Sequence, residues 1–159
     1  EWYLERVRKI RSVIPDGGIT TDVIAGFCGE TEQDHKDTLT LMEEVVFDSA
    51  FMFAYSERPG TLASRKYPDD IPYELKTQRL NEIIALQGRM SLKSNEKEVG
   101  RILKVLVEGP SKKNQEELCG RASSNKMCVF PSRGEKAGDY CEVEVVSVTS
   151  ATLLCKRLD

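Results

Sequence analysis

The chain has 159 residues, of which 40% are hydrophobic and 31% are charged, and its formal net charge is −3. This composition is typical of a globular protein and excludes a disordered tail or a uniformly basic nucleic-acid-binding chain. No apolar run approaches the ~20 residues that a membrane-spanning helix needs, so no membrane association is expected. Any nucleic-acid binding must come from local basic clusters rather than from bulk charge.

The cysteines and the single histidine restrict the chemistry of the chain. An odd number of widely spaced cysteines, with no C-x-x-C pair, predicts neither a disulfide framework nor a metal site, and it favours a reducing, cytoplasmic location. These residues are Cys28, Cys119, Cys128, Cys141 and Cys155. His35 is the only histidine and is expected on the polar side of a helix, so His-rich metal or triad chemistry within this chain is excluded. We identify no catalytic residue and no metal ligand.

The first third of the chain predicts an α-β-α-β order. Helical spacing of apolar residues covers 2–14, an apolar strand covers 19–25, and a second helix covers 31–46, with Thr31 as its cap and Asp34 completing a weak capping box. Residues 49–55 (SAFMFAY) are apolar throughout, which predicts a strand covered on both faces. The crossover rule makes the two strands parallel.

Two parallel strands do not complete a domain, because a parallel sheet needs further strands and helices on both faces. We therefore infer that this part is the end of a larger α/β domain whose earlier strands are absent. The chain also begins without Met, inside a helix, which suggests a fragment. Its open strand edge predicts exposed apolar surface and self-association. A long helix from Pro72 to about residue 94 then leads to the second part.

The pattern changes to short alternating runs after Val99. In residues 141–146 (CEVEVV), Cys141, Val143 and Val145 face one way and the two glutamates face the other. Five such runs predict a small closed antiparallel barrel of the OB type, a fold that often binds single-stranded or looped nucleic acid. The predicted strands are 101–108, 118–122, 126–130, 140–148 and 151–156. The fold class is thus α/β followed by all-β, with domains at 1–94 and 95–159.

A glycine-punctuated loop follows the first predicted strand. Gly26 and Gly29 allow close backbone approach, and such a junction is where α/β folds place ligands. Glu30 disfavours a phosphate there and suits a ligand with ammonium or hydroxyl groups. The alternative is an ordinary tight turn before a capped helix. Asp22 lies within an apolar strand and must be paired or face a ligand.

Basic residues of the predicted barrel gather in loops and at strand ends, where they are positioned to meet phosphates. Each of them is alternatively an ordinary surface charge. Phe130 either stacks on a base or belongs to the core, and a lone aromatic in its strand is more typical of a core. Arg58, beside Pro59 and Gly60, either fixes a carboxylate or phosphate or is a helix-capping or surface arginine. The candidate RNA-binding residues are Lys112, Lys113, Arg121, Asn125, Lys126, Phe130 and Arg133.

Three long motifs resemble the carboxyl-terminal part of the radical-SAM methylthiotransferases, and most closely the tRNA-modifying MiaB type. They read TTDVIAGFCGETEQDHKDTL, FDSAFMFAYSERPGTLA and VLVEGPSKKNQEELCGRASSNKMCVFP. The family usually has proline where Cys28 stands. The resemblance implies a remnant of an open (βα)6 radical-SAM barrel followed by a TRAM domain. The parent enzyme would use S-adenosylmethionine and two 4Fe–4S clusters, whose cysteine ligands would lie upstream of this chain.

The same resemblance implies a substrate and a set of site residues. The substrate would be isopentenyladenosine next to the tRNA anticodon, converted to its 2-methylthio form, with the anticodon stem-loop as partner. This chain alone would be inactive. The strand and loop that match the family's cofactor side imply S-adenosylmethionine contacts from Thr21, Asp22, Gly26, Gly29, Glu30, Tyr55 and Arg58. Two alternatives remain: a stand-alone RNA-binding module, or a methylthiotransferase that acts on a ribosomal-protein side chain.

Overall fold

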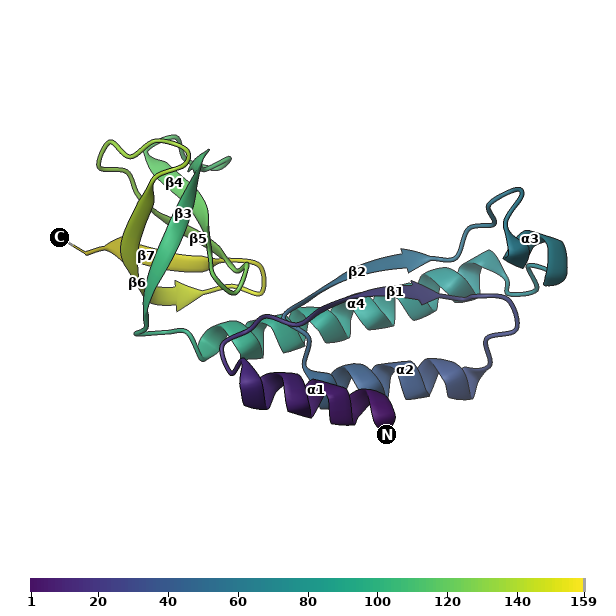
Figure 1. The fold of residues 1–159 in the computed structure, drawn as a ribbon. Coiled ribbons are helices and arrows are strands. Elements are labelled where there is room, and N and C mark those ends of the chain that lie inside the picture. Colours follow the sequence, from purple (N-terminus) through teal and green to yellow (C-terminus); the bar gives the residue numbers. More distant parts are fainter. Residues whose placement is uncertain (159) are drawn as a thin grey trace. The chain divides into compact units, whose positions relative to one another are not determined.

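The computed structural model describes residues 1–158 (Figure 1). Its contacts divide the chain into two compact units, one of residues 19–89 and one that combines residues 1–18 with the chain from residue 90 onward. This grouping differs from the predicted domains, 1–94 and 95–159, at residues 1–18 and 90–94. The division at residues 94 and 95 stays a proposal.

The unit of residues 19–89 is built on two parallel strands, as predicted. β1 (Thr20–Ala25) pairs with β2 (Ser49–Ala54) in a register that runs from Thr20↔Ser49 to Ala25↔Ala54. The crossover between them is α2 (Glu32–Val45), and most of α4 (Tyr73–Glu96) lies in the same unit. A short helix, α3 (Leu62–Lys66), was not predicted, and it begins where the Thr61 hydroxyl accepts the Ser64 N–H.

Only one face of this two-stranded sheet is covered within the described residues, so the prediction of a strand buried on both faces is wrong here. Burial alternates along both strands. The covered side packs against a core that includes Met42 and Ile83, whereas Ile24, Phe51 and Phe53 are 52%, 65% and 54% exposed. The predicted exposure of apolar surface is therefore confirmed, because no helix of this unit reaches the second face.

The helix start at Thr31 forms as predicted. The Thr31 hydroxyl accepts the Asp34 N–H at 3.2 Å, and the Asp34 carboxylate accepts the Thr31 N–H at 2.9 Å. These reciprocal bonds satisfy two of the donors that a helix start leaves free. The Thr31 hydroxyl also donates to the Asp34 carboxylate at 2.6 Å, and this bond, followed by that from the Thr31 N–H, lowers the pKa of Asp34 below its ordinary value. The capping box thus fixes where the loop after β1 ends.

The other unit contains α1 (Trp2–Val13), the end of α4 and a closed barrel with strand order β3-β4-β5-β7-β6 (Figure 1). Each strand lies within a few residues of its predicted position. The bounds are β3 Ile102–Pro110, β4 Glu117–Ala122, β5 Met127–Pro131, β6 Tyr140–Val148 and β7 Leu153–Arg157.

The barrel is mixed, so the antiparallel prediction is wrong at one strand pair. β5 and β7 run parallel, with Cys128 opposite Leu153 and Val129 opposite Leu154, while the other four pairs are antiparallel. The reason is the strand order of the closed barrel, in which β7 lies between β5 and β6. Because the pairs β5–β4, β4–β3, β3–β6 and β6–β7 are all antiparallel, β7 must run in the same direction as β5. Alternation within a strand carries no information about this direction.

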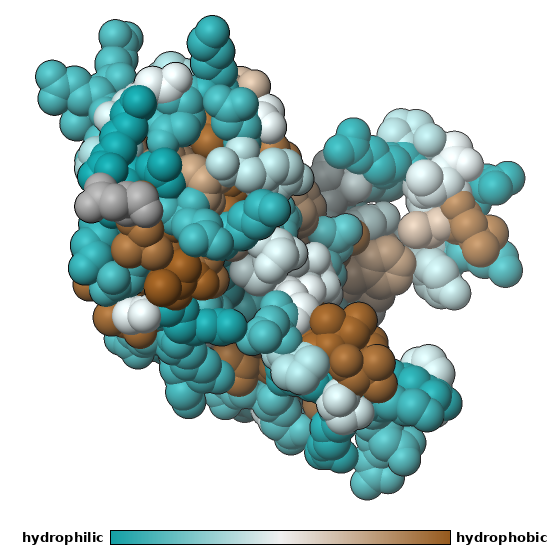
Figure 2. All heavy atoms as spheres, turned by 60° about the vertical axis from the view of Figure 1, so that its left-hand side comes forward, coloured by the Kyte–Doolittle hydropathy of each residue, from teal (hydrophilic) through white to brown (hydrophobic). Residues whose placement is uncertain are grey.

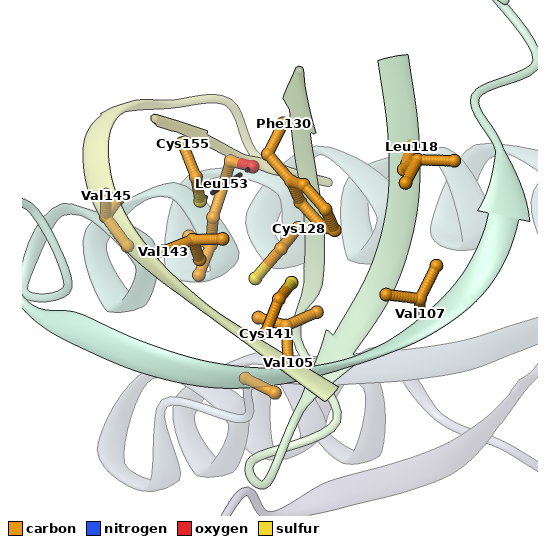
Figure 3. Packing of buried hydrophobic residues seen from close by; sticks show 11 residues of the cluster. Val105, Val107, Leu118, Cys128, Phe130, Cys141, Val143, Val145, Leu153 and Cys155 are labelled. Carbon is orange, nitrogen blue, oxygen red and sulfur yellow. Dashed lines mark hydrogen bonds between the residues drawn. The ribbon is translucent and has the colours of Figure 1, made fainter. Parts of the chain in front are cut away.

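The barrel encloses one hydrophobic core (Figure 3). Cys141, Val143 and Val145 of β6 all point inward, as the alternation predicted. Cys128 and Cys155 are buried beside them and act as small apolar residues. Burial raises the pKa of the Cys141 thiol, and a hydrogen bond with Cys128 together with burial raises that of Cys155, so both stay protonated at neutral pH.

Hydrophobic side chains also reach the surface in several separate patches, shown in brown in Figure 2. Trp2 and Val13 of α1 are 67% and 71% exposed. None of the helices among residues 1–158 combines the length and the apolar character needed to cross a membrane.

We expect Gly120→Ala to destabilise the barrel. Gly120 lies in β4, and a Cβ there would come within 2.3 Å of the Leu106 carbonyl oxygen, which is backbone and cannot rotate away. Such overpacking costs about 1–3 kcal/mol. Gly88 in α4 has open space at the same position, so Gly88→Ala should stabilise its helix by about 0.5–1 kcal/mol. Urea denaturation of both variants tests this, and equal stability of wild type and Gly120→Ala would contradict the packing described.

Candidate functional site

The loop after β1 has the backbone that its glycines predicted. Gly26 and Gly29 have φ of 72° and 77°, a region that side-chain-bearing residues rarely adopt. Both N–H groups are already used within the unit: Gly26 donates to the two carboxylate oxygens of Glu30 at 3.0 Å each, and Gly29 donates to Asp70 at 2.8 Å. The loop therefore provides a fixed shape rather than free donors for an anion.

Glu30 is held by a second partner, Arg79 of α4. Arg79 Nη1 donates to the Glu30 carboxylate at 2.8 Å and to its carbonyl oxygen at 3.0 Å, and the Arg79 side chain is only 4% exposed. A buried ion pair with two further hydrogen bonds orients both partners. Glu30 was predicted as a ligand contact. Its carboxylate is occupied internally, so we reassign it to shaping the loop.

Lys76 is a buried residue of this region that the sequence did not identify. Its ammonium pairs with Asp69, lies 5.1 Å from the centre of the Tyr55 ring, and approaches the Tyr55 carbonyl oxygen at 3.5 Å. A Cβ on Gly26 would meet the Lys76 side chain at 2.4 Å, so glycine is required for this close approach. The only available signal was the helical spacing of Lys76 from Arg79, which places both on one face of α4.

Aromatic rings gather where the two strands end. Phe27 packs edge-on against Tyr55, with ring centres 5.0 Å apart, and contacts Tyr67 at 6.4 Å. The pKa of Tyr55 is raised above its ordinary value, first by a hydrogen bond with Cys28 and then by burial, so its hydroxyl stays protonated. Tyr55, predicted to line the cofactor, is thus tied into a cluster of rings and a lysine at this edge of the sheet.

The remaining predicted cofactor residues of this unit are more open. Asp22 is exposed on the uncovered face of the sheet, directly opposite Phe51 in the register. The hydroxyl of Thr21 donates to the Asp22 carbonyl oxygen at 3.3 Å. Arg58 is exposed in the loop after β2, where its carbonyl oxygen accepts two bonds from Thr61. Asp22 and Arg58 therefore retain charged groups that a ligand can reach.

His35 is buried, which corrects its predicted place on the polar side of a helix. It is 3% exposed, and its Nε2 lies 2.8 Å from the Glu82 carboxylate of α4. This contact lowers the pKa of Glu82 below its ordinary value, with a smaller contribution from Gln78. The pair joins α2 to α4 across 47 residues of sequence, a distance that helical periodicity cannot reveal.

Two of the predicted RNA-binding residues of the barrel unit are buried or paired within the folded chain. Phe130 is 1% exposed inside the barrel (Figure 3), so base stacking by this residue is ruled out in the folded chain. Lys126 Nζ donates to Ser94 Oγ at 2.9 Å and to its carbonyl oxygen at 3.1 Å, and it pairs with Glu98 at 3.3 Å. It attaches the barrel to the end of α4 instead of meeting phosphates.

The other predicted RNA-binding residues lie on the surface of the barrel. Lys112 and Lys113 are exposed in the loop between β3 and β4, and Arg133 is exposed in the loop between β5 and β6. Arg121 Nε donates to Glu108 at 2.9 Å, and its Nη1 donates to the Asn125 carbonyl oxygen at 3.0 Å. Asn125 has φ 64°, a left-handed position that closes the tight turn between β4 and β5.

Within residues 1–158, no group of three or more His, Cys, Asp or Glu side chains has the geometry to hold a metal ion. Three of the five cysteines are separately used as core residues of the barrel. The described side chains therefore do not fit an iron–sulfur cluster.

We expect Glu30→Gln to destabilise the 19–89 unit by about 3–5 kcal/mol, because it leaves the buried Arg79 without its buried anionic partner. Glu32 is the matched control: it is 63% exposed and lies 3.6 Å from the same guanidinium. Glu32→Gln should cost less than about 1 kcal/mol. Denaturation followed by circular dichroism separates the two, and equal effects would show that the Glu30 pair is not a buried constraint.

We also expect acid to weaken the contact between α2 and α4. Because the pKa of Glu82 is lowered in the folded state, its contribution is present above the ordinary pKa of a glutamate and is lost as pH falls through the lowered value. The melting temperature of Glu82→Gln should therefore fall less between about pH 5 and pH 3 than that of the wild type. Glu74, an exposed glutamate of the same helix, is the control. If the melting temperatures of wild type and Glu82→Gln fall equally as the pH is lowered, the stabilising role assigned to the Glu82 contact is refuted.

Comparison with known proteins identifies relatives of the barrel and of the chain as a whole. The TRAM domain family matches residues 96–156, which contain the five barrel strands almost completely. The chain is 53% identical over 153 residues to the tRNA-2-methylthio-N(6)-dimethylallyladenosine synthase of Phocaeicola vulgatus, covering 96% of this chain and 34% of that protein. The synthases of Bacteroides fragilis and Amoebophilus asiaticus are 50% and 51% identical, covering 96% of this chain and 34% and 32% of theirs.

The similarity thus extends over nearly all of this chain but over only about one third of the length of these relatives. It includes both the α/β unit and the barrel, as the three motifs predicted. Residues 96–156 are a TRAM domain, and the chain as a whole is similar to the carboxyl-terminal part of the tRNA-2-methylthio-N(6)-dimethylallyladenosine synthases.

Proposed function

We propose that this chain is the carboxyl-terminal part of a radical-SAM tRNA methylthiotransferase, which adds a 2-methylthio group to isopentenyladenosine next to the anticodon. The observation that carries the proposal is identity of 50% or more across 96% of the chain to synthases named for this product, together with the TRAM domain. A tRNA substrate also implies a cytoplasmic protein.

In this proposal the α/β unit provides part of the S-adenosylmethionine site. Asp22 and Arg58 are the charged groups left open for the cofactor, and Tyr55 follows β2 directly. Gly26, Gly29 and Glu30 set the shape of the loop through their contacts with Asp70 and Arg79. The two 4Fe–4S clusters would be held by cysteines outside this sequence, because the described side chains do not fit them. The chain by itself would therefore be inactive.

The barrel provides RNA binding in the same proposal, with the anticodon stem-loop as ligand. Lys112 and Lys113 are the exposed cations of one hairpin loop, and Arg133 lies in another loop of the barrel. Lys126 and Phe130 are not part of this surface, because the first pairs with Glu98 and the second is buried in the core. The uncovered face of β1 and β2 is also available for self-association, through Phe51 and Phe53.

The test of RNA binding is fluorescence anisotropy of a labelled anticodon stem-loop with the 159-residue chain. We expect Lys112→Ala with Lys113→Ala to weaken binding and to reduce the salt slope, by roughly 0.7–0.9 for each phosphate that is no longer neutralised. Lys66→Ala, an exposed lysine of α3 in the other unit, is the matched control. Binding that is absent, or unchanged in the double variant, would count against this surface.

The test of the reaction is mass spectrometry of tRNA from cells that express the complete gene. The proposal expects 2-methylthio-isopentenyladenosine to appear with the intact gene and not with this chain alone. It also expects the complete protein to bind iron and sulfide. Intact tRNA modification in cells from which the gene has been deleted would contradict the proposed substrate.

A further inference from the structure

The outer surface of the barrel carries a groove that brings two of the predicted RNA-binding residues, Arg121 and Asn125, together with residues that the sequence did not single out. It has a volume of about 420 Å³ and lies between β3, the β4–β5 turn and the start of β6. Its wall includes Leu106, Arg121, Asn125 and Tyr140. A volume in this range holds one small organic group, such as a nucleotide. All of these residues belong to the same compact unit.

Tyr140 is the most unusual residue of the groove, because it is a large aromatic side chain with 62% of its surface exposed. It lies directly opposite Leu106 in the register of β3 and β6, and Leu106 is itself 37% exposed. The ammonium of Lys104 lies 4.9 Å from the centre of the Tyr140 ring. The ring is therefore held beside an apolar neighbour and a cation, while most of it remains in contact with solvent.

Arg121 forms a second fixed element of the groove. Its Nε and Nη1 are bound to Glu108 and Asn125, which hold the guanidinium plane in place. Its Nη2 makes no hydrogen bond to any residue that the structure describes and can donate to a ligand. Among the lining groups, Lys104 and Arg121 are positive and Glu108 is negative and already paired, so the groove carries a net positive charge.

We propose that this groove binds one unpaired nucleotide of the RNA, with its base stacked on Tyr140 against Leu106 and its phosphate near Lys104 and Arg121. An exposed aromatic ring beside a basic residue is the combination that single-stranded nucleic acid uses, because every base has a π-face and every nucleotide a phosphate. The amide of Asn125 lies at the same edge and can hydrogen-bond a base. The inference rests on the proposed tRNA-binding function and names a specific subsite for it.

The test uses anisotropy of the labelled anticodon stem-loop with the 159-residue chain. Tyr140→Ala should weaken binding roughly 10-fold, because it removes the platform for one stacked base, and should leave the salt slope unchanged. Tyr140→Phe keeps the ring and should bind within about twofold of wild type. Lys104→Ala should reduce the salt slope by roughly 0.7. Tyr73, 74% exposed on α4 in the other unit, is the matched control, and Tyr73→Ala should bind as wild type.

The outcomes separate this inference from the function on which it rests. If wild type binds and Tyr140→Ala binds equally well, the groove is not a subsite, and the RNA-binding proposal stands through Lys112 and Lys113. If Tyr140→Phe loses as much affinity as Tyr140→Ala, stacking is refuted. If wild type does not bind the stem-loop at low salt, both proposals fail together. Equal melting temperatures of the variants show that no loss of affinity arises from unfolding, as expected for an exposed side chain.

Discussion

The arrangement of the α/β unit follows from one constraint: two parallel strands crossed by helices on one side can bury only one of their faces. Ile24, Phe51 and Phe53 lie on the face that remains. Exposing three large apolar side chains together is costly in water, and a protein normally covers such a patch. A short sheet supplies little packing area of its own, and α4 is additionally attached to the loop after β1 by the buried ion pair of Arg79 with Glu30. The pair of Arg79 with Glu30 holds the loop in place, and the Lys76 side chain, whose ammonium pairs with Asp69 just before α4, lies close against Gly26 of the loop.

The barrel differs from the two-stranded sheet, because its closure removes every strand edge and encloses one core. Its stability therefore depends on its own strands, and its outer surface is free to carry binding groups. The exposed lysines of one hairpin and the groove around Tyr140 are both on that surface. Lys126 is the exception, since it is used to hold the end of α4.

Local signals allowed much of the fold to be predicted, and distant partners set the limit. The alternation in residues 141–146 identified the inward side of β6, and Thr31 with Asp34 identified a helix start, because these patterns depend on neighbours in sequence. The roles of Glu30, His35 and Lys126 depend on Arg79, Glu82 and Ser94, which lie 32–49 residues away. The parallel β5–β7 pair is a property of closure and leaves no trace in either strand. The groove escaped prediction for the same reason: Leu106 and Tyr140 become neighbours only when β3 pairs with β6.

The most direct test is hydrogen exchange of the 159-residue chain, resolved by peptide. The central claim is that the barrel is complete in itself and the two-stranded sheet is not. We predict that backbone amides of β1 and β2 exchange at least ~100-fold faster than the core amides of β3 and β6, because local opening of an uncovered sheet requires far less free energy than global unfolding. Equally slow exchange in β1, β2 and the barrel strands would show that the sheet is self-sufficient and would contradict this claim.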